Sequence, residues 1–124
     1  MSRCPCLSGN PYEECCGPIH AGAPAPTAER LMRSRFSAFA RGLPAHLLTT
    51  WHPRTRPAEL DLDPDVRWLV LDVLRTEAGG PFDTSGVVEF RASWRSPDDR
   101  GALHETSSFV RESGRWFYVD GIMG

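Results

Sequence analysis

The 124-residue sequence contains no lysine, so all 14 of its basic residues are arginines. Acidic residues number 16, and the formal net charge at pH 7 is −2. A broad electrostatic argument for nucleic-acid binding requires a basic excess, which this composition lacks. We interpret the all-arginine set as a coding bias of the genome. The alternative is recognition of an anion or of RNA by the planar arginine side chain.

Long hydrophobic runs are also missing. The sequence has no apolar stretch of about 18 residues, so it predicts no membrane-spanning helix. The N-terminal residues Met1 to Cys4 lack the apolar run of a secretory signal peptide. We therefore expect a cytoplasmic protein that does not enter a membrane.

Cysteine is absent after residue 16, and all four cysteines precede that point: Cys4, Cys6, Cys15 and Cys16. A disulfide framework joins distant segments of a small secreted chain, whereas a cytosolic cluster of this kind indicates a metal site. The order is C-x-C, eight residues and C-C. The turn-forming run from Ser8 to Pro11 lets the chain fold back between the two pairs. Four thiolates in a tetrahedron suit zinc.

The cluster predicts one structural zinc ion per chain. Because the protein would fill all four positions, no water remains on the metal for Lewis-acid chemistry. Two alternatives stay open at this point. In one, His20 replaces Cys16 as the fourth ligand; in the other, the segment is a metal-free, disordered or oxidised tail.

Helical signals come next along the chain. Thr27 is a good N-cap for a helix that Gly42 ends, and Pro44 can open a second helix that ends at His52-Pro53. Residues 53–65 indicate a loop, with one short helical turn near residues 58–60. We therefore divide the chain into a zinc-binding segment (1–20), a linker (21–26) and one domain (27–124).

The second half of the sequence changes its hydrophobic period. Four strands are predicted, over residues 66–75, 88–95, 103–110 and 115–119, and we expect the first of them to be well buried. Helices followed by an antiparallel meander predict the α+β class, with the helices packed on one face of the sheet.

Two charged residues fall on faces that should be buried. Arg35 lies within the apolar arc of the first long helix, and Glu105 shares a strand face with Leu103 and Phe109. A buried charge needs a partner, so we expect these two side chains to lie within hydrogen-bonding distance. They form either a structural ion pair or the wall of a pocket for a polar ligand.

Other residues are weaker candidates for chemistry. Asp72 and Asp120 could each act as a general base, His52 could belong to a site or end the second helix, and Trp51 could line an aromatic pocket. We expect His46 and His104 to be exposed. No motif for nucleophilic catalysis or phosphate binding is visible, so no residue is assigned as catalytic.

The cysteine segment resembles the SEC-C motif, a short zinc-binding element also found at the end of the SecA translocation ATPase. The matching residues are Cys4, Pro5, Cys6, Ser8, Gly9, Cys15 and Cys16. Leu7 stands where the motif often has glycine, and Cys16 stands where histidine is common. The resemblance implies a four-thiolate zinc site and, because the segment is an interaction element in SecA, a protein partner.

Three further stretches, at 31–39, 50–53 and 109–121, resemble the YchJ family of bacterial proteins. The resemblance spans nearly the whole chain. It implies a fold like that of nuclear transport factor 2 (NTF2), a cystatin-like cone in which helices lie across a strongly curved sheet, often with a pocket between them. Such folds host isomerases, dehydratases and cyclases as well as binding modules, so fold alone does not decide function.

These observations together predict a zinc-binding protein that acts as a non-catalytic interaction or ligand-binding module. The first alternative is a small-molecule enzyme of isomerase, hydrolase or lyase type that works in the pocket. The second is an RNA-associated protein, although the charge balance does not favour nucleic acid. A homodimer through the sheet is a further expectation, since proteins of this fold often associate in that way.

Overall fold

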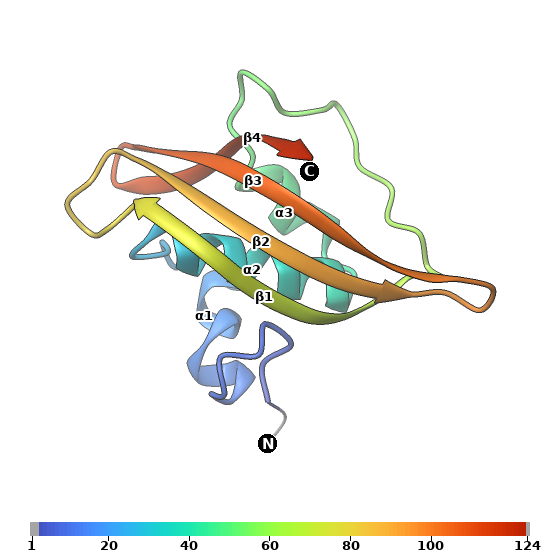
Figure 1. Ribbon diagram of the computed structural model, residues 1–124. Helices are drawn as coiled ribbons and strands as arrows, with labels where there is room; N and C mark the ends of the chain where they lie inside the picture. The colour runs from blue at the N-terminus through green and yellow to red at the C-terminus, as the bar shows by residue number, and fades with distance from the viewer. Residues whose placement is uncertain (1–2, 124) are drawn as a thin grey trace.

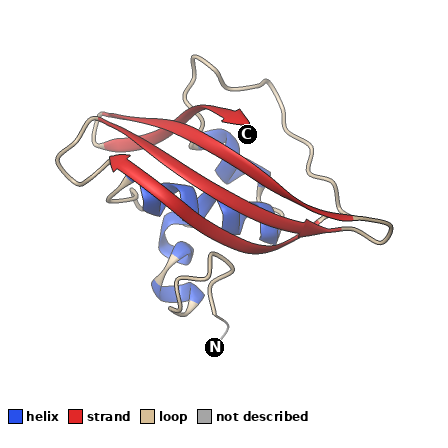
Figure 2. Cartoon of the chain, viewed as in Figure 1, coloured by secondary structure: helices blue, strands red, loops and turns tan. Residues whose placement is uncertain are grey.

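The computed structural model describes residues 3–123 and has helices packed on one face of a curved four-stranded sheet (Figures 1 and 2). The elements in chain order are η1 (Tyr12–Glu14), α1 (Cys16–His20), α2 (Ala28–Arg41), α3 (Pro44–Thr49), β1 (Arg67–Ala78), β2 (Ser85–Arg95), β3 (Arg100–Glu112) and β4 (Arg115–Met123). The strands follow the order β1-β2-β3-β4 and are all antiparallel. The predicted α+β architecture is therefore confirmed.

Helix α2 separates two parts of the molecule. One side of it contacts the sheet, while α1 and the N-terminal segment lie on the side away from the sheet (Figure 1). Within residues 3–123, no helix is long and apolar enough to cross a membrane.

The predicted helix boundaries are confirmed for α2. The side chain of Thr27 accepts a hydrogen bond from the backbone N–H of Arg30 at 3.1 Å, and Gly42 ends the helix with a left-handed φ of 71°. Pro44 opens α3 as predicted, but α3 ends at Thr49 rather than at His52. The reason is a competing contact with β4. The backbone N–H groups of Tyr118 and His52 donate to the carbonyls of Thr50 and Tyr118, respectively.

The predicted helical turn at residues 58–60 was wrong. This stretch has no helical turn, and the turns in this loop lie at residues 53–55 and 64–65. The first of them is closed by the carbonyl of His52. There the backbone N–H groups of Thr55 and Arg56 both donate to the carbonyl oxygen of His52. His52, held by β4, therefore determines where the chain turns.

Strand β1 is an edge strand and is mostly exposed, so the expectation of a well-buried strand was wrong. Leu71 is its one fully buried residue. Irregular pairing with β2 inserts Leu69 and Leu74 between paired residues, and these side chains are 48% and 53% exposed. The apolar run fails to predict burial because two bulges break its alternation and helices cover only one sheet face.

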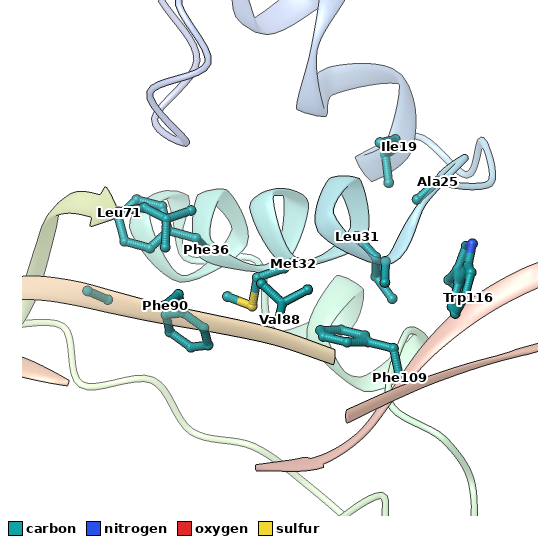
Figure 3. Packing of buried hydrophobic residues seen from close by; sticks show 12 residues of the cluster. Ile19, Ala25, Leu31, Met32, Phe36, Leu71, Val88, Phe90, Phe109 and Trp116 are labelled. Atoms are coloured by element: carbon teal, nitrogen blue, oxygen red, sulfur yellow. The ribbon is translucent and has the colours of Figure 1, made fainter. Parts of the chain in front are cut away.

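The core lies between α2 and the covered face of the sheet. Met32 and Phe36 of α2 point toward Val88 and Phe90 of β2 (Figure 3). Ile19 and Ala25 belong to the same core, packed near Leu31 and Trp116 at one end of the helix (Figure 3). The predicted zinc segment and linker thus each contribute a side chain to the core of the following domain; the domain boundaries themselves stay a prediction.

Candidate functional site

The four cysteine sulfurs form one compact, buried group. They lie within 4.8 Å of one another, and all four side chains are at most 3% exposed. The sulfur of Cys15 is 3.6 Å from that of Cys6 and 3.9 Å from that of Cys16. Tetrahedral zinc with Zn–S bonds of about 2.3 Å requires sulfurs separated by about 3.8 Å, so the geometry suits this ion. All four cysteines are free thiols here.

His20 is turned away from the sulfurs. Its Nε2–H donates to the carbonyl oxygen of Ser34 at 2.7 Å, so Nδ1 accepts from the Tyr12 hydroxyl at 2.6 Å. Both ring nitrogens are therefore occupied by protein groups. The structure brings together Cys4, Cys6, Cys15 and Cys16, the four residues predicted as ligands, while ligation itself stays a prediction.

The loop between the cysteine pairs folds back as its composition predicts. Gly9 adopts a φ of 90°, and Leu7 adopts a φ of 65°, which is uncommon for a non-glycine residue. The backbone N–H of Leu7 donates to the Cys4 carbonyl at 3.1 Å, while the backbone N–H of Cys4 donates to the Asn10 carbonyl at 2.9 Å. These contacts bring Cys4 and Cys6 over Cys15 and Cys16.

Side chains of α2 hold the cysteine segment in place. The Ser37 hydroxyl is completely buried and lies 3.3 Å from the sulfur of Cys16 and 3.4 Å from that of Cys4. Arg33 donates from Nη1 to the Cys6 carbonyl at 3.0 Å, and Arg30 donates from Nη2 to the Cys15 carbonyl at 3.4 Å. Two positive charges and one hydroxyl thus face a site that carries a formal charge of −2 when four thiolates hold a divalent ion.

This support from α2 was not anticipated from the sequence. Arg3, which neighbours Cys4 in the sequence, instead donates from Nη1 to the Gly9 carbonyl within the loop. The sequence does contain a pattern from which this support could have been predicted. Arg30, Arg33 and Ser37 recur at helical spacing on the face of α2 opposite its apolar stripe.

As free thiols, the cysteines hold their protons unevenly. The hydrogen bond from Cys16 lowers the pKa of Cys6 to about 4, although burial opposes this shift. The same contact, together with burial, raises the pKa of Cys16, and burial raises the pKa of Cys15. Cys6 is therefore the first of these thiols to ionise, and the remaining thiols would have to release their protons for a metal ion to bind.

His46 is buried, so the expectation that it is exposed was wrong. Its ring is 9% exposed, its Nε2 lies 3.0 Å from the Ser34 hydroxyl, and it stacks edge-on against His20 with 4.6 Å between ring centroids. Burial lowers the pKa of His46 to about 4, and the nearby charges of His20 and Arg35 act in the same direction. Burial also lowers the pKa of His20.

His104 is half-buried and contacts Glu89 through Nε2 on the outer face of the sheet.

A second candidate site is a pocket of about 180 Å³ between α2 and the sheet. Arg35, Glu105 and Trp51 all line it, together with Ser107, Tyr118 and several apolar side chains. Arg35 is 4% exposed, which confirms its inward position, whereas Glu105 is only partly buried.

The predicted direct pairing of Arg35 with Glu105 was wrong. Arg35 instead donates from Nη1 to the Leu47 carbonyl and the Thr50 hydroxyl, both at 2.8 Å. Its guanidinium lies 4.4 Å from the ring centroid of Tyr118, and the Tyr118 hydroxyl donates to Glu105 at 3.2 Å. Tyr118 thus lies between the two charges and contacts both.

The positive charge of Arg35 persists at neutral pH. Burial lowers the pKa of Arg35 to about 10, while Tyr118 and Glu105 oppose that shift. Burial and the neighbouring Glu105 carboxylate raise the pKa of Tyr118. Arg35 therefore stays positively charged, and Tyr118 keeps the proton that it donates.

The other three predicted residues lie outside this pocket. His52 accepts at Nδ1 from the backbone N–H of Arg54, so its Nε2–H donates to Glu112 at 3.0 Å and fixes the loop to the β3–β4 end of the sheet. Asp72 and Asp120 are exposed, on β1 and β4. Neither carboxylate is close enough to the pocket to line it.

Comparison with known proteins gives the family. The model of the YchJ middle NTF2-like domain matches residues 27–121. The chain belongs to the YchJ family. Among YchJ relatives, the UPF0225 protein SCO1677 of Streptomyces coelicolor is 56% identical over 95% of this chain and 93% of its own length. The UPF0225 protein of Chromobacterium violaceum is 50% identical over 98% of this chain and 93% of its own length.

Two solved structures resemble this member of the YchJ family. The solution structure of RPA3114, a SEC-C motif containing protein from Rhodopseudomonas palustris, is 33% identical, covers 96% of both chains and has a TM-score of 0.82. The crystal structure of a SEC-C motif containing protein from Psychrobacter arcticus is 28% identical, covers 98% of this chain and 82% of that one, and has a TM-score of 0.78. The resemblances to the YchJ family and to the SEC-C motif are therefore confirmed.

Removal of the Ser37 hydroxyl should weaken metal binding. The Ser37→Ala variant loses the hydroxyl beside the sulfurs of Cys4 and Cys16, and loss of such a supporting contact costs roughly 10–100-fold in metal affinity. Competition with a chromophoric zinc chelator measures this change. The control is Ser85→Ala, at an exposed position on β2, which should bind zinc as the wild type does. Equal affinities for all three proteins would contradict the role of Ser37.

His46 should make the fold sensitive to mild acid. In the unfolded chain His46 becomes protonated below about pH 6.5, whereas in the folded chain it becomes protonated only near pH 4. The unfolded state therefore binds more protons in this range, and the free energy of unfolding falls as the pH falls. Between pH 6.5 and 5 the loss should be about 2 kcal/mol for this group. Urea unfolding of the wild type and of His46→Gln at both pH values isolates the contribution of His46. Loss of metal in acid affects both proteins equally and cancels in the comparison. The same pH dependence in the two proteins would contradict the assignment.

Proposed function

We propose that the protein binds one zinc ion through Cys4, Cys6, Cys15 and Cys16 and acts as a non-catalytic binding module. The observation that carries this proposal is the closed cluster of four buried cysteines, fixed to α2 by Ser37. A tetrahedral ion held by four sulfurs has no open position for water or substrate.

The metal has a structural task in this proposal. The segment before α2 has a small apolar cluster, formed by the cysteines with Tyr12, and zinc binding is worth roughly 10–16 kcal/mol in small zinc-binding peptides. That free energy suffices to order the segment against α2. Because Ile19 lies in the core beside α2, an ordered segment also completes the hydrophobic core.

The distribution of carboxylates supports binding rather than catalysis. Asp72 and Asp120, the two carboxylates first considered as general bases, are exposed and away from the pocket. One observation favours the alternative of a small-molecule enzyme: Glu105 and Tyr118 share a hydrogen bond at the pocket wall, where a carboxylate could accept a proton from a substrate.

The partner-binding surface in this proposal is the exposed tip of the zinc segment. Residues 7–10 are exposed, and Leu7 presents an apolar side chain that is 52% exposed. The outer face of the sheet is less suited to an apolar homodimer contact. There Arg75 contacts Glu77 and Glu89, and Glu89 also contacts His104, which together form a partly exposed ionic network.

Metal analysis tests the zinc assignment. Protein purified without added zinc should contain about one equivalent, and the cobalt-substituted protein should show the absorption of a tetrahedral four-thiolate site. Cys16→Ser should lower the affinity strongly because it removes one of the four sulfurs, whereas His20→Gln should keep one equivalent. The proposal fails if Cys16→Ser retains full affinity while the histidine variant loses the metal.

The tip of the segment can be tested without disturbing the metal. Asparagine tolerates the left-handed φ of Leu7, so Leu7→Asn should keep fold and zinc while removing the apolar contact. Burying a leucine is worth roughly 1.5–3 kcal/mol, so capture of a protein partner by this variant should fall at least tenfold. The control Phe82→Ser removes another exposed apolar side chain, in the β1–β2 turn, and should not affect capture. If the two variants behave alike, the tip is not the partner-binding surface.

A further inference from the structure

Arg35 is a buried cation whose hydrogen bonding is incomplete. Its side chain is 4% exposed, and only Nη1 has hydrogen-bond partners, the Leu47 carbonyl and the Thr50 hydroxyl. Among the described residues, Nε and Nη2 of Arg35 have none. A buried cation without a carboxylate in direct contact is costly, so this arrangement requires a further explanation.

Arg35 lines the pocket, and its Nε and Nη2 are not fully covered by other atoms. Three fully covered side-chain nitrogens lack a partner in the described part of the chain: Nε of Arg30 and Nε1 of Trp51 and of Trp116. The nitrogens of Arg35 are not among these, so its unpaired nitrogens keep some accessible surface. Arg35 also lines the 180 Å³ pocket. Its small exposed area is therefore available to a molecule inside the pocket.

Glu105 presents the opposite charge to the same space. Its Oε2 accepts hydrogen bonds from Ser107 and Tyr118, whereas Oε1 has no partner among the described residues. The carboxylate lies directly against Gly121, where a Cβ atom would collide with it. Two donors and one glycine thus hold Glu105 against the pocket wall.

Tyr118 keeps the two charges from neutralising each other directly. Its ring lies under the Arg35 guanidinium, and its hydroxyl is used by Glu105. The pocket therefore offers hydrogen-bond donors from Arg35 and an acceptor from Glu105 at separate points. The rest of its lining is largely apolar, including Met32, Phe36, Phe90 and Leu103.

We propose that this pocket binds a small uncharged molecule that joins an apolar or aromatic body to a polar group with both an acceptor and a donor, of the carboxamide type. The acceptor receives N–H groups of Arg35, and the donor is bound by Oε1 of Glu105. An anionic ligand would be repelled by Glu105, and a cationic ligand would be repelled by Arg35. The volume is smaller than the roughly 300–1,000 Å³ of pockets for drug-sized ligands, so the ligand is small.

This inference rests on the proposed binding role and specifies the ligand class. It does not depend on which metal the cysteines hold, because the pocket and the cluster lie on opposite faces of α2. The zinc content and the binding of a ligand in the pocket can therefore be measured on the same sample. A failure of the metal assignment is then distinguishable from a failure of the pocket assignment.

Three probes of nearly equal shape test the ligand class: benzamide, benzoate and benzamidinium, which are neutral, negative and positive at pH 7. The zinc-loaded full chain should bind benzamide about tenfold more tightly than either charged probe. Titration by amide chemical-shift changes gives the affinities and locates the site, and Trp51 and Trp68 in the lining provide a fluorescence readout. Equal binding of all three probes, no binding of benzamide, or shifts that map away from α2 and Tyr118 would overturn the proposal.

Charge variants sharpen this test. Glu105→Gln leaves Arg35 as the one pocket charge, so the preference should move from benzamide to benzoate by about tenfold. Glu89→Gln is the matched control: it makes the same change of charge on the outer face of the sheet and should leave the order of affinities as it is in the wild type.

Gly121→Ala displaces the Glu105 carboxylate without changing charge and should weaken benzamide binding, which keeps the test open if Glu105→Gln does not fold. An unchanged preference in a folded Glu105→Gln, or undiminished benzamide binding by Gly121→Ala, would overturn the proposal.

Discussion

The contact between the cysteine cluster and α2 determines how the N-terminal part of the chain is placed. A segment of this length has almost no core of its own, and the sulfurs of Cys4 and Cys16 meet the buried hydroxyl of Ser37 on the helix. Arg33 and Arg30 donate to the backbone carbonyls of Cys6 and Cys15 from the same helix face. The four cysteines and α2 therefore pack against each other as one unit.

The two faces of α2 have different tasks because of helical periodicity. Arg30, Arg33, Ser34 and Ser37 face the cysteine segment, and Met32, Arg35 and Phe36 face the sheet. The polar face carries contacts to the cysteine cluster, His20 and His46, whereas the apolar face forms the core and the pocket.

The covered and uncovered faces of the sheet are equally distinct. The covered face carries the buried residues of β2 and β3 and the pocket residues Glu105 and Ser107. The outer face carries Arg75, Glu89 and His104 in contact with one another. The single layer of helices explains why a strand as apolar as β1 remains largely exposed at the edge.

The sequence by itself determined the features that depend on neighbouring residues. These are the four clustered cysteines with a turn between them, the caps of α2 at Thr27 and Gly42, the antiparallel meander and the inward position of Arg35. Each is a matter of local spacing or of the period of one element, which a single sequence displays directly.

The tertiary structure alone decided which of these inward side chains meet. Sequence periodicity places Arg35 and Glu105 on facing surfaces but cannot show that Tyr118 lies between them. It also cannot show that His46 is buried against His20, or that two bulges expose Leu69 and Leu74. Such contacts depend on strand register and on how a helix lies across the sheet. These are set by the packing of the whole core and not by any one segment.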